Sequence, residues 1–116
     1  MTIERIESNA RMSQAIVHGD TIWLSGQVAK SAVGGSVTEQ TTEILAGIDA
    51  LLATAGSDRT KLLSLTIWLS DMDTFTEMNM VWDGWVSPDA APARATVEAR
   101  LAAPAYKVEI AAVAAR

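Results

Sequence analysis

The most informative charged residue in the sequence is Glu109, which lies in the apolar run from Val108 to Val113. A carboxylate in such surroundings has its pKa raised by desolvation, or lowered by a cationic partner such as Arg94. Either effect makes Glu109 a candidate for acid–base catalysis. The structural alternative is a buried ion pair between Glu109 and Arg94, and the sequence leaves both readings open.

Arg94 follows Pro92-Ala93 and begins a predicted strand. A guanidinium at a strand end can bind a carboxylate through two parallel hydrogen bonds. Arg94 is therefore a candidate for binding an anionic substrate. The alternative is an ion pair with an acid on a neighbouring strand, for which Glu98 and Glu109 are available.

Asn79 is the one polar member of a stripe at helical spacing. The other members are Phe75, Met78, Trp82, Trp85 and Val86. An amide among apolar residues costs about 1–3 kcal/mol unless it is hydrogen-bonded. Asn79 is thus either a structural amide bonded to nearby backbone or an amide that lines a ligand cleft. We assign the two tryptophans to the core.

The composition argues against several other chemistries. The chain has 116 residues, a net charge of −5, no Cys and one His. Without Cys there are no disulfides, thiolate metal sites or Cys nucleophile. His18 lies beside a predicted turn without a Ser or Asp partner, and no Lys-Ser/Thr follows Gly34-Gly35 to make a phosphate loop. One histidine leaves no room for a multi-His metal site.

The charge distribution and the length limit the partners and the domain count. No Lys/Arg cluster offsets the negative charge, so nucleic acid and anionic membranes are not expected partners. The N-terminal segment is charged where a signal peptide is apolar, and no apolar run approaches the ~18–20 residues of a membrane span. We expect one cytoplasmic domain that covers residues 1–116.

Two elements near the N-terminus position part of this chemistry. Two β-rich runs between Gln14 and Ser25 flank Gly19-Asp20, which predicts a hairpin with a type II′ turn. Apolar residues from Val37 to Ala55 recur every three or four positions, which predicts a helix. Ser36 and Glu39 have the spacing of a capping box, and Gly56 is suited to the residue after the helix.

The C-terminal half predicts three strands and a second helix. Residues 61–70 alternate, with Leu63, Leu65, Ile67 and Leu69 on one side. Thr74 and Glu77 repeat the capping-box spacing before the stripe that contains Asn79. Strands are predicted from Arg94 to Leu101 and from Tyr106 to Val113. The second is apolar enough for cover on both faces, and its high alanine content makes a helix the alternative.

The predicted order is ββ-α-β-α-ββ, an α+β fold with two helices on one face of a sheet. The open face is expected to carry Trp23, Ser64, Thr66, Trp68 and one side of the strand that begins at Arg94, namely Arg94, Thr96, Glu98 and Arg100 (the Arg94 row). Tryptophans among Ser and Thr are unusual on a solvated face, because exposed aromatic patches usually mark an interface. We therefore expect this face to be buried in an oligomer.

An ordered series of short motifs resembles the RidA/YjgF family of reactive-intermediate deaminases. The motifs span nearly the whole chain, and the segment Leu101–Ile110 is most similar to the YoaB-like branch, often called Rid2. They are Arg11-Met12-Ser13-Gln14-Ala15, Leu24-Ser25-Gly26-Gln27, Glu39-Gln40-Thr41, Asp73-Thr74-Phe75 through Asn79, Pro92-Ala93-Arg94-Ala95-Thr96-Val97-Glu98 and Val108-Glu109-Ile110.

The resemblance implies a chorismate-mutase-like fold, a homotrimer with clefts between subunits, and hydrolysis of enamines and imines such as 2-aminoacrylate and 2-iminopropanoate. Arg94 would hold the substrate carboxylate and Glu109 would orient the attacking water. Ser25, Gly26 and Asn79 would line the cleft. The resemblance also implies that no metal and no organic cofactor takes part.

Two positions depart from the family pattern. Met12 replaces a tyrosine and Thr96 replaces a frequent cysteine, and both are expected to contact substrate. A trimer that binds a 2-oxo or amino acid without catalysis is the alternative function. An endoribonuclease-type translation inhibitor is a third reading, which the charge of −5 and the single histidine disfavour.

Overall fold

Six strands, two α-helices and two short 3₁₀ turns make up the computed structural model, which describes residues 1–116. In chain order they are β1 (Ile3–Ser8), β2 (Ser13–His18), β3 (Thr21–Gln27), α1 (Val37–Thr54), η1 (Arg59–Lys61), β4 (Leu62–Leu69), η2 (Met72–Thr74), α2 (Phe75–Trp85), β5 (Ala93–Glu98) and β6 (Val108–Ala115).

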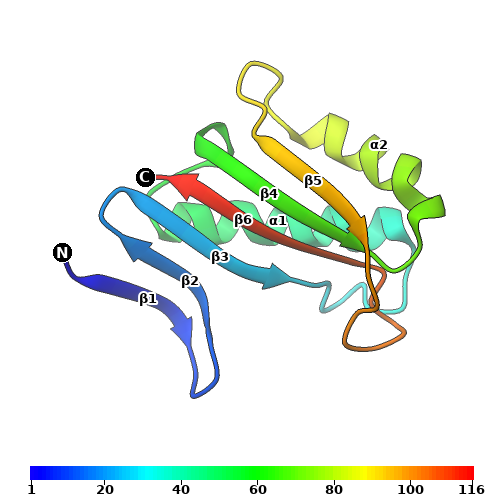
Figure 1. Cartoon of the computed structure of the whole chain (residues 1–116), viewed down its shortest axis with the longest axis horizontal. Helices are drawn as coiled ribbons and strands as arrows, with labels where there is room; N and C mark the ends of the chain where they lie inside the picture. The colour runs from blue at the N-terminus through cyan, green and yellow to red at the C-terminus, as the bar shows by residue number, and fades with distance from the viewer.

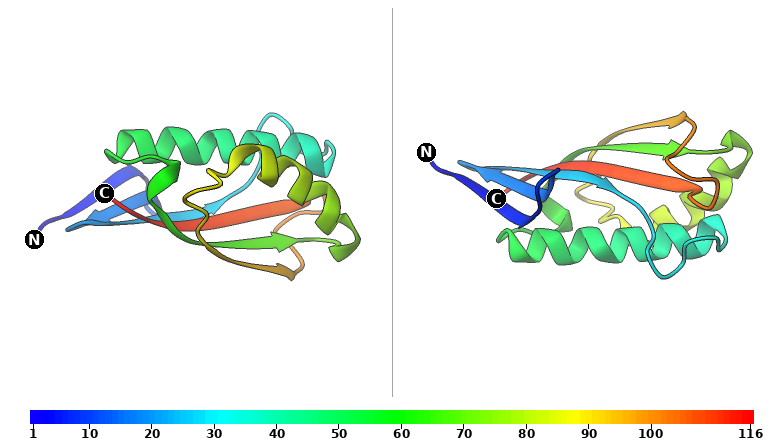
Figure 2. Two further views of the ribbon diagram at one scale, coloured as in Figure 1. Left: turned by 90° about the horizontal axis from the view of Figure 1, so that it is seen from above. Right: turned by 90° about the horizontal axis from the view of Figure 1, so that it is seen from below.

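The strands form one sheet in the order β1-β2-β3-β6-β4-β5, with both helices on the same face (Figures 1 and 2). All neighbouring strands are antiparallel except β4 and β5, which are parallel. A core of 22 buried residues joins the helices to the sheet. The predicted α+β architecture with helices on one face is confirmed. Neither helix is long and apolar enough to cross a membrane.

The first helix and the first hairpin form where their sequence patterns predict them. At the start of α1, Glu39 N donates to Ser36 Oγ and Ser36 N donates to Glu39 Oε1, both at 3.0 Å, so the capping box is present. Gly56 follows the helix with a φ of +84°. Gly19 has a φ of +61° and His18 pairs with Thr21, as a two-residue turn with Gly first requires.

The N-terminal strand β1 is absent from the sequence-based prediction. Only Ile6 of its six residues is buried, so the segment has no alternating apolar pattern to detect. Its position at the sheet edge explains this composition, because charged residues such as Glu4 and Arg5 discourage pairing with another chain. The observed order is therefore βββ-α-β-α-ββ.

Two local predictions in the second half are wrong. Leu63 is 52% exposed because the pairing of β4 with β6 shifts between Leu62 and Ser64, which turns Leu63 away from the core. Thr74 and Glu77 form no capping box, because the η2 turn precedes α2 and Thr74 Oγ1 donates to Asp71 O at 2.6 Å. Strands β5 and β6 also end elsewhere than predicted, at Glu98 and at Ala115.

The Arg94 row lies on the helix face of β5, opposite to the predicted face. The parallel register pairs Leu65 with Arg94 and Trp68 with Val97. Leu65 is buried under the helices, so Arg94 shares its side, whereas Val97 lies on the open face with Trp68. The apolar row of this edge strand therefore faces outward, and Val97 is 43% exposed.

Candidate active site

Arg94 is held in a fixed orientation against helix α2. Its Nη1 donates to Asn79 Oδ1 at 2.7 Å. Its Cζ lies 5.1 Å from the ring centroid of Trp82 and 5.9 Å from that of Phe75. Positions 75, 79 and 82 share one helical face, so one stretch of α2 supplies all three contacts.

Arg94 has no acidic partner within the chain. The ion pairs of the structure are Arg59–Asp49 and Arg116–Glu4. Within one chain, therefore, Arg94 forms no ion pair with Glu98 or Glu109, the structural alternative that the sequence left open. A guanidinium carries five N–H donors, and Asn79 uses one of them. The remaining donors can bind a planar carboxylate in bidentate fashion.

Asn79 and Trp82 both contact Arg94, which the sequence did not predict. The amide of Asn79 is bonded to Arg94, and not to neighbouring backbone as one reading proposed. Trp82 is buried in the core as expected, yet its ring also stacks with the Arg94 guanidinium. The spacing of Phe75, Asn79 and Trp82 was visible in the sequence, but it could not show that Arg94 lies beside them.

Glu109 lies on the opposite face of the sheet from Arg94. It pairs with Trp68 across β4 and β6, on the face that the helices leave open. The side chain of Glu109 is half-buried and makes no hydrogen bond or ion pair within the chain. One chain therefore does not bring Arg94 and Glu109 together, because a packed sheet separates their side chains.

Gly26 makes room for the Glu109 carboxylate. The pairing of β3 with β6 shifts between Leu24 and Gln27, which places Ser25 and Gly26 in a bulge beside Glu109. A Cβ at Gly26 would overlap the carboxylate and lie 2.9 Å from its Cδ. Only glycine permits this approach without movement of Glu109.

The other predicted substrate-binding residues divide between the two faces. Thr96 follows Arg94 on the helix side of β5, and its buried hydroxyl has no hydrogen-bond partner. Ser25 lies beside Gly26, and its Oγ donates to Ser13 O at 2.5 Å. Met12 is 38% exposed in the turn between β1 and β2.

The segment that follows β3 is anchored by Glu43 of α1. The backbone N–H groups of Lys30, Ser31 and Ala32 donate to its carboxylate at 2.7 to 3.1 Å. These three hydrogen bonds, led by the one from Ala32, lower the pKa of Glu43. They fix the chain where it leaves the strand that carries Ser25 and Gly26.

The fold and these residues together define the class of protein, an α+β domain with one six-stranded sheet and both helices on the same face. A family model described as endoribonuclease L-PSP matches residues 2–116, so the chain belongs to this family, and the resemblance to RidA/YjgF proteins is confirmed. The RutC family protein YoaB of Escherichia coli is 44% identical over 99% of both chains. A RutC family protein of Haemophilus influenzae is 43% identical over 98% of both chains.

Solved structures agree with this assignment. A YjgF family protein from Neisseria meningitidis superposes with a TM-score of 0.96 at 43% identity, covering 100% of this chain and 96% of that one. A putative translation initiation inhibitor from Salmonella typhimurium has a TM-score of 0.90 at 42% identity, covering 99% and 98%. The predicted fold is thus the fold of these relatives.

Proposed function

We propose that this protein hydrolyses imines and enamines derived from amino acids to 2-oxo acids and ammonia. The observation that carries the proposal is Arg94, a guanidinium held by Asn79 and two aromatic rings with no acidic partner in its own chain. Such a group is preorganised for the carboxylate of a small anionic substrate. The names of the relatives vary, and none of them specifies this reaction.

Glu109 is the group that would activate water. In the proposed reaction water adds to the C=N carbon of the protonated imine while Glu109 accepts one of the water protons. Glu109 then gives this proton to the nitrogen of the resulting carbinolamine. The C–N bond breaks to release ammonia, and the carbinolamine hydroxyl gives its proton to Glu109 as the C=O bond forms. A positioned general base typically contributes 10²–10⁴-fold, which suits a substrate that already hydrolyses in water.

The two halves of the proposed site require a second copy of the chain. Arg94 lies at the free edge of the sheet, and Glu109 lies on its open face. The open face exposes 43% of Trp23 and has a hollow of about 230 Å³. We infer a homotrimer in which Arg94 of one subunit meets Glu109 of the next.

Ammonia release tests the proposed activity. An amino-acid oxidase generates a panel of 2-imino acids in place, and the purified protein is expected to accelerate their conversion to 2-oxo acid and ammonia. Binding of 2-oxo acids without acceleration would favour the alternative function, a non-catalytic binding trimer. RNA cleavage is disfavoured by the net charge of −5.

Gly26→Ala is expected to lower kcat by at least about tenfold, because the added methyl group displaces the Glu109 carboxylate from its position. Steady-state kinetics on a 2-imino acid measures the effect. Gly84→Ala is the matched control, since a Cβ at Gly84 meets nothing within 4 Å. It should leave kcat unchanged. An unaltered kcat in Gly26→Ala would show that the close approach to Glu109 has no role in turnover.

A further inference from the structure

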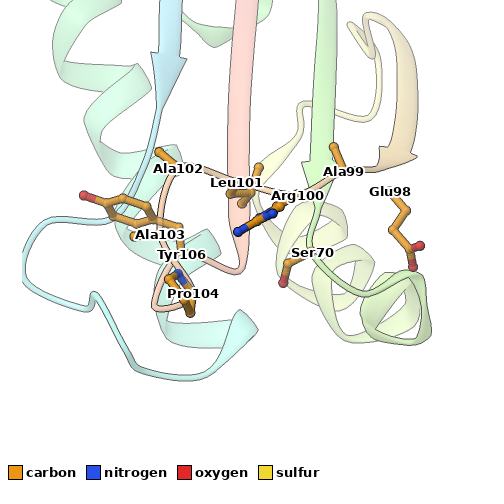
Figure 3. A pocket seen from close by; sticks show the side chains of 9 residues that line it. All are labelled: Ser70, Glu98, Ala99, Arg100, Leu101, Ala102, Ala103, Pro104 and Tyr106. Carbon is orange, nitrogen blue, oxygen red and sulfur yellow. The ribbon is translucent and has the colours of Figure 1, made fainter.

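The largest cavity of the structure lies away from the proposed catalytic residues. It has a volume of about 580 Å³ at the end of the sheet where β4 and β5 finish (Figure 3). Neither Arg94 nor Glu109 lines it. Five of its nine lining residues are hydrophobic, and its charged residues are Glu98 and Arg100. A cavity of this volume, lined by hydrophobic residues and a few charged ones, is typical of sites that bind small molecules.

The loop that forms most of this cavity is held in place on both sides. Ala99 N donates to Leu69 O at 2.9 Å. The fully buried side chain of Gln40 donates to Ala105 O at 2.9 Å and accepts from Lys107 N at 3.0 Å. A ligand would therefore meet a preformed cavity and would not have to order the loop on binding.

The two charged residues of the cavity do not neutralise each other. Glu98 and Arg100 form no ion pair, and Arg100 makes no side-chain hydrogen bond. Glu98 accepts from Met72 N at 2.9 Å through Oε2, which leaves Oε1 free. In Figure 3 Arg100 extends toward the Pro104 side of the cavity, and Glu98 lies on the other side of Ser70.

We propose that this cavity binds a free α-amino acid with an apolar side chain. The carboxylate of the ligand binds the Arg100 guanidinium, and its ammonium group binds Glu98 and the Ser70 hydroxyl. Its side chain packs against Leu101 and Pro104. A zwitterion matches an unpaired cation and an unpaired anion across one cavity better than an ion of either sign. This site goes beyond the proposed hydrolysis and does not depend on it.

Calorimetric titration with three probes tests the proposal. L-leucine carries both charges, 4-methyl-2-oxopentanoate lacks the ammonium group, and 3-methylbutylamine lacks the carboxylate. Each titration uses the wild type and Arg94→Ala, so that binding at the Arg94 clamp is separated from binding in the cavity. L-leucine is expected to bind saturably to both proteins. In Arg94→Ala, each singly charged probe is expected to bind at least about tenfold more weakly than L-leucine.

Two variants assign the contacts. Arg100→Gln should abolish binding of L-leucine, whereas the control Arg5→Gln, on β1, should not change it. Glu98→Gln can still accept from Met72 N, and it should weaken L-leucine about tenfold without weakening the oxo acid. Leucine binding that survives Arg100→Gln, that is lost in Arg94→Ala, or that is matched by both singly charged probes would overturn the proposal. Loss of deaminase activity alone would not overturn this proposal.

Discussion

Replacement of Arg94 by Ala is expected to lower kcat/KM for 2-imino acids by about 10²-fold or more. A carboxylate held by two charged hydrogen bonds loses about 1.5–3 kcal/mol for each of them. The variant also loses the Asn79 hydrogen bond and the stacking on Trp82. These contacts are worth roughly 1–2 kcal/mol to stability, so the variant should still fold. Steady-state ammonia release and a thermal melt measure the two effects separately.

Arg59 provides a matched control for Arg94. Its Cζ also lies over a tryptophan, 4.8 Å from the ring centroid of Trp85, but its Nη2 is paired with Asp49 at 2.5 Å. Arg59→Ala should therefore lower the melting temperature more than Arg94→Ala does, and leave KM unchanged. Equal kcat/KM in Arg94→Ala and wild type, or failure of Arg94→Ala to fold, would show that Arg94 has a structural role only.

Glu109→Gln should lower kcat by about 10²-fold or more, because the amide cannot accept the proton of the attacking water. Affinity for a 2-oxo acid should stay equal or improve, since a negative charge near the ligand carboxylate is removed. The melting temperature should hold, because Glu109 forms no ion pair within its own chain and the amide keeps the size and hydrogen-bonding reach of the carboxylate toward Arg94 of the next subunit. Ammonia release, 2-oxo-acid titration and a thermal melt are the three measurements.

The opposite pattern would contradict the role of Glu109 as a base. Turnover equal to that of wild type, together with a lowered melting temperature, would mean that the carboxylate stabilises the assembly and does not act on water. That result would favour the binding-trimer function.

Much of the fold could be predicted, because a helix or strand that is buried on one face has apolar residues at regular intervals in the sequence. The period of α1 and the turn residues of the β2–β3 hairpin are local signals, and both elements form as predicted. Strand β1 lacks such a signal, because an edge strand with one buried residue has no apolar face. The missed bulge at Leu63 depends on its partner strand β6, which a single segment does not reveal.

The candidate residues could be chosen from the sequence, but their arrangement could not. Alternation in β5 separates Arg94 and Thr96 from Ala95 and Val97, yet only the register with β4 decides which pair faces the helices. Ala95 and Val97, the apolar pair, face away from the helices, whereas apolar side chains of a single chain usually face its core. This inversion is understandable if the outward face is an interface between subunits.

The most direct test of the composite site is complementation between two inactive variants. Arg94→Ala and Glu109→Gln chains with different affinity tags are co-expressed, and trimers that carry both tags are purified. Around a ring, each mixed trimer pairs an intact Arg94 with an intact Glu109 at one of its three interfaces, so about one third of wild-type ammonia release is expected. If both residues act from the same chain, mixed trimers would be no more active than either variant alone, and that result would contradict the proposed site.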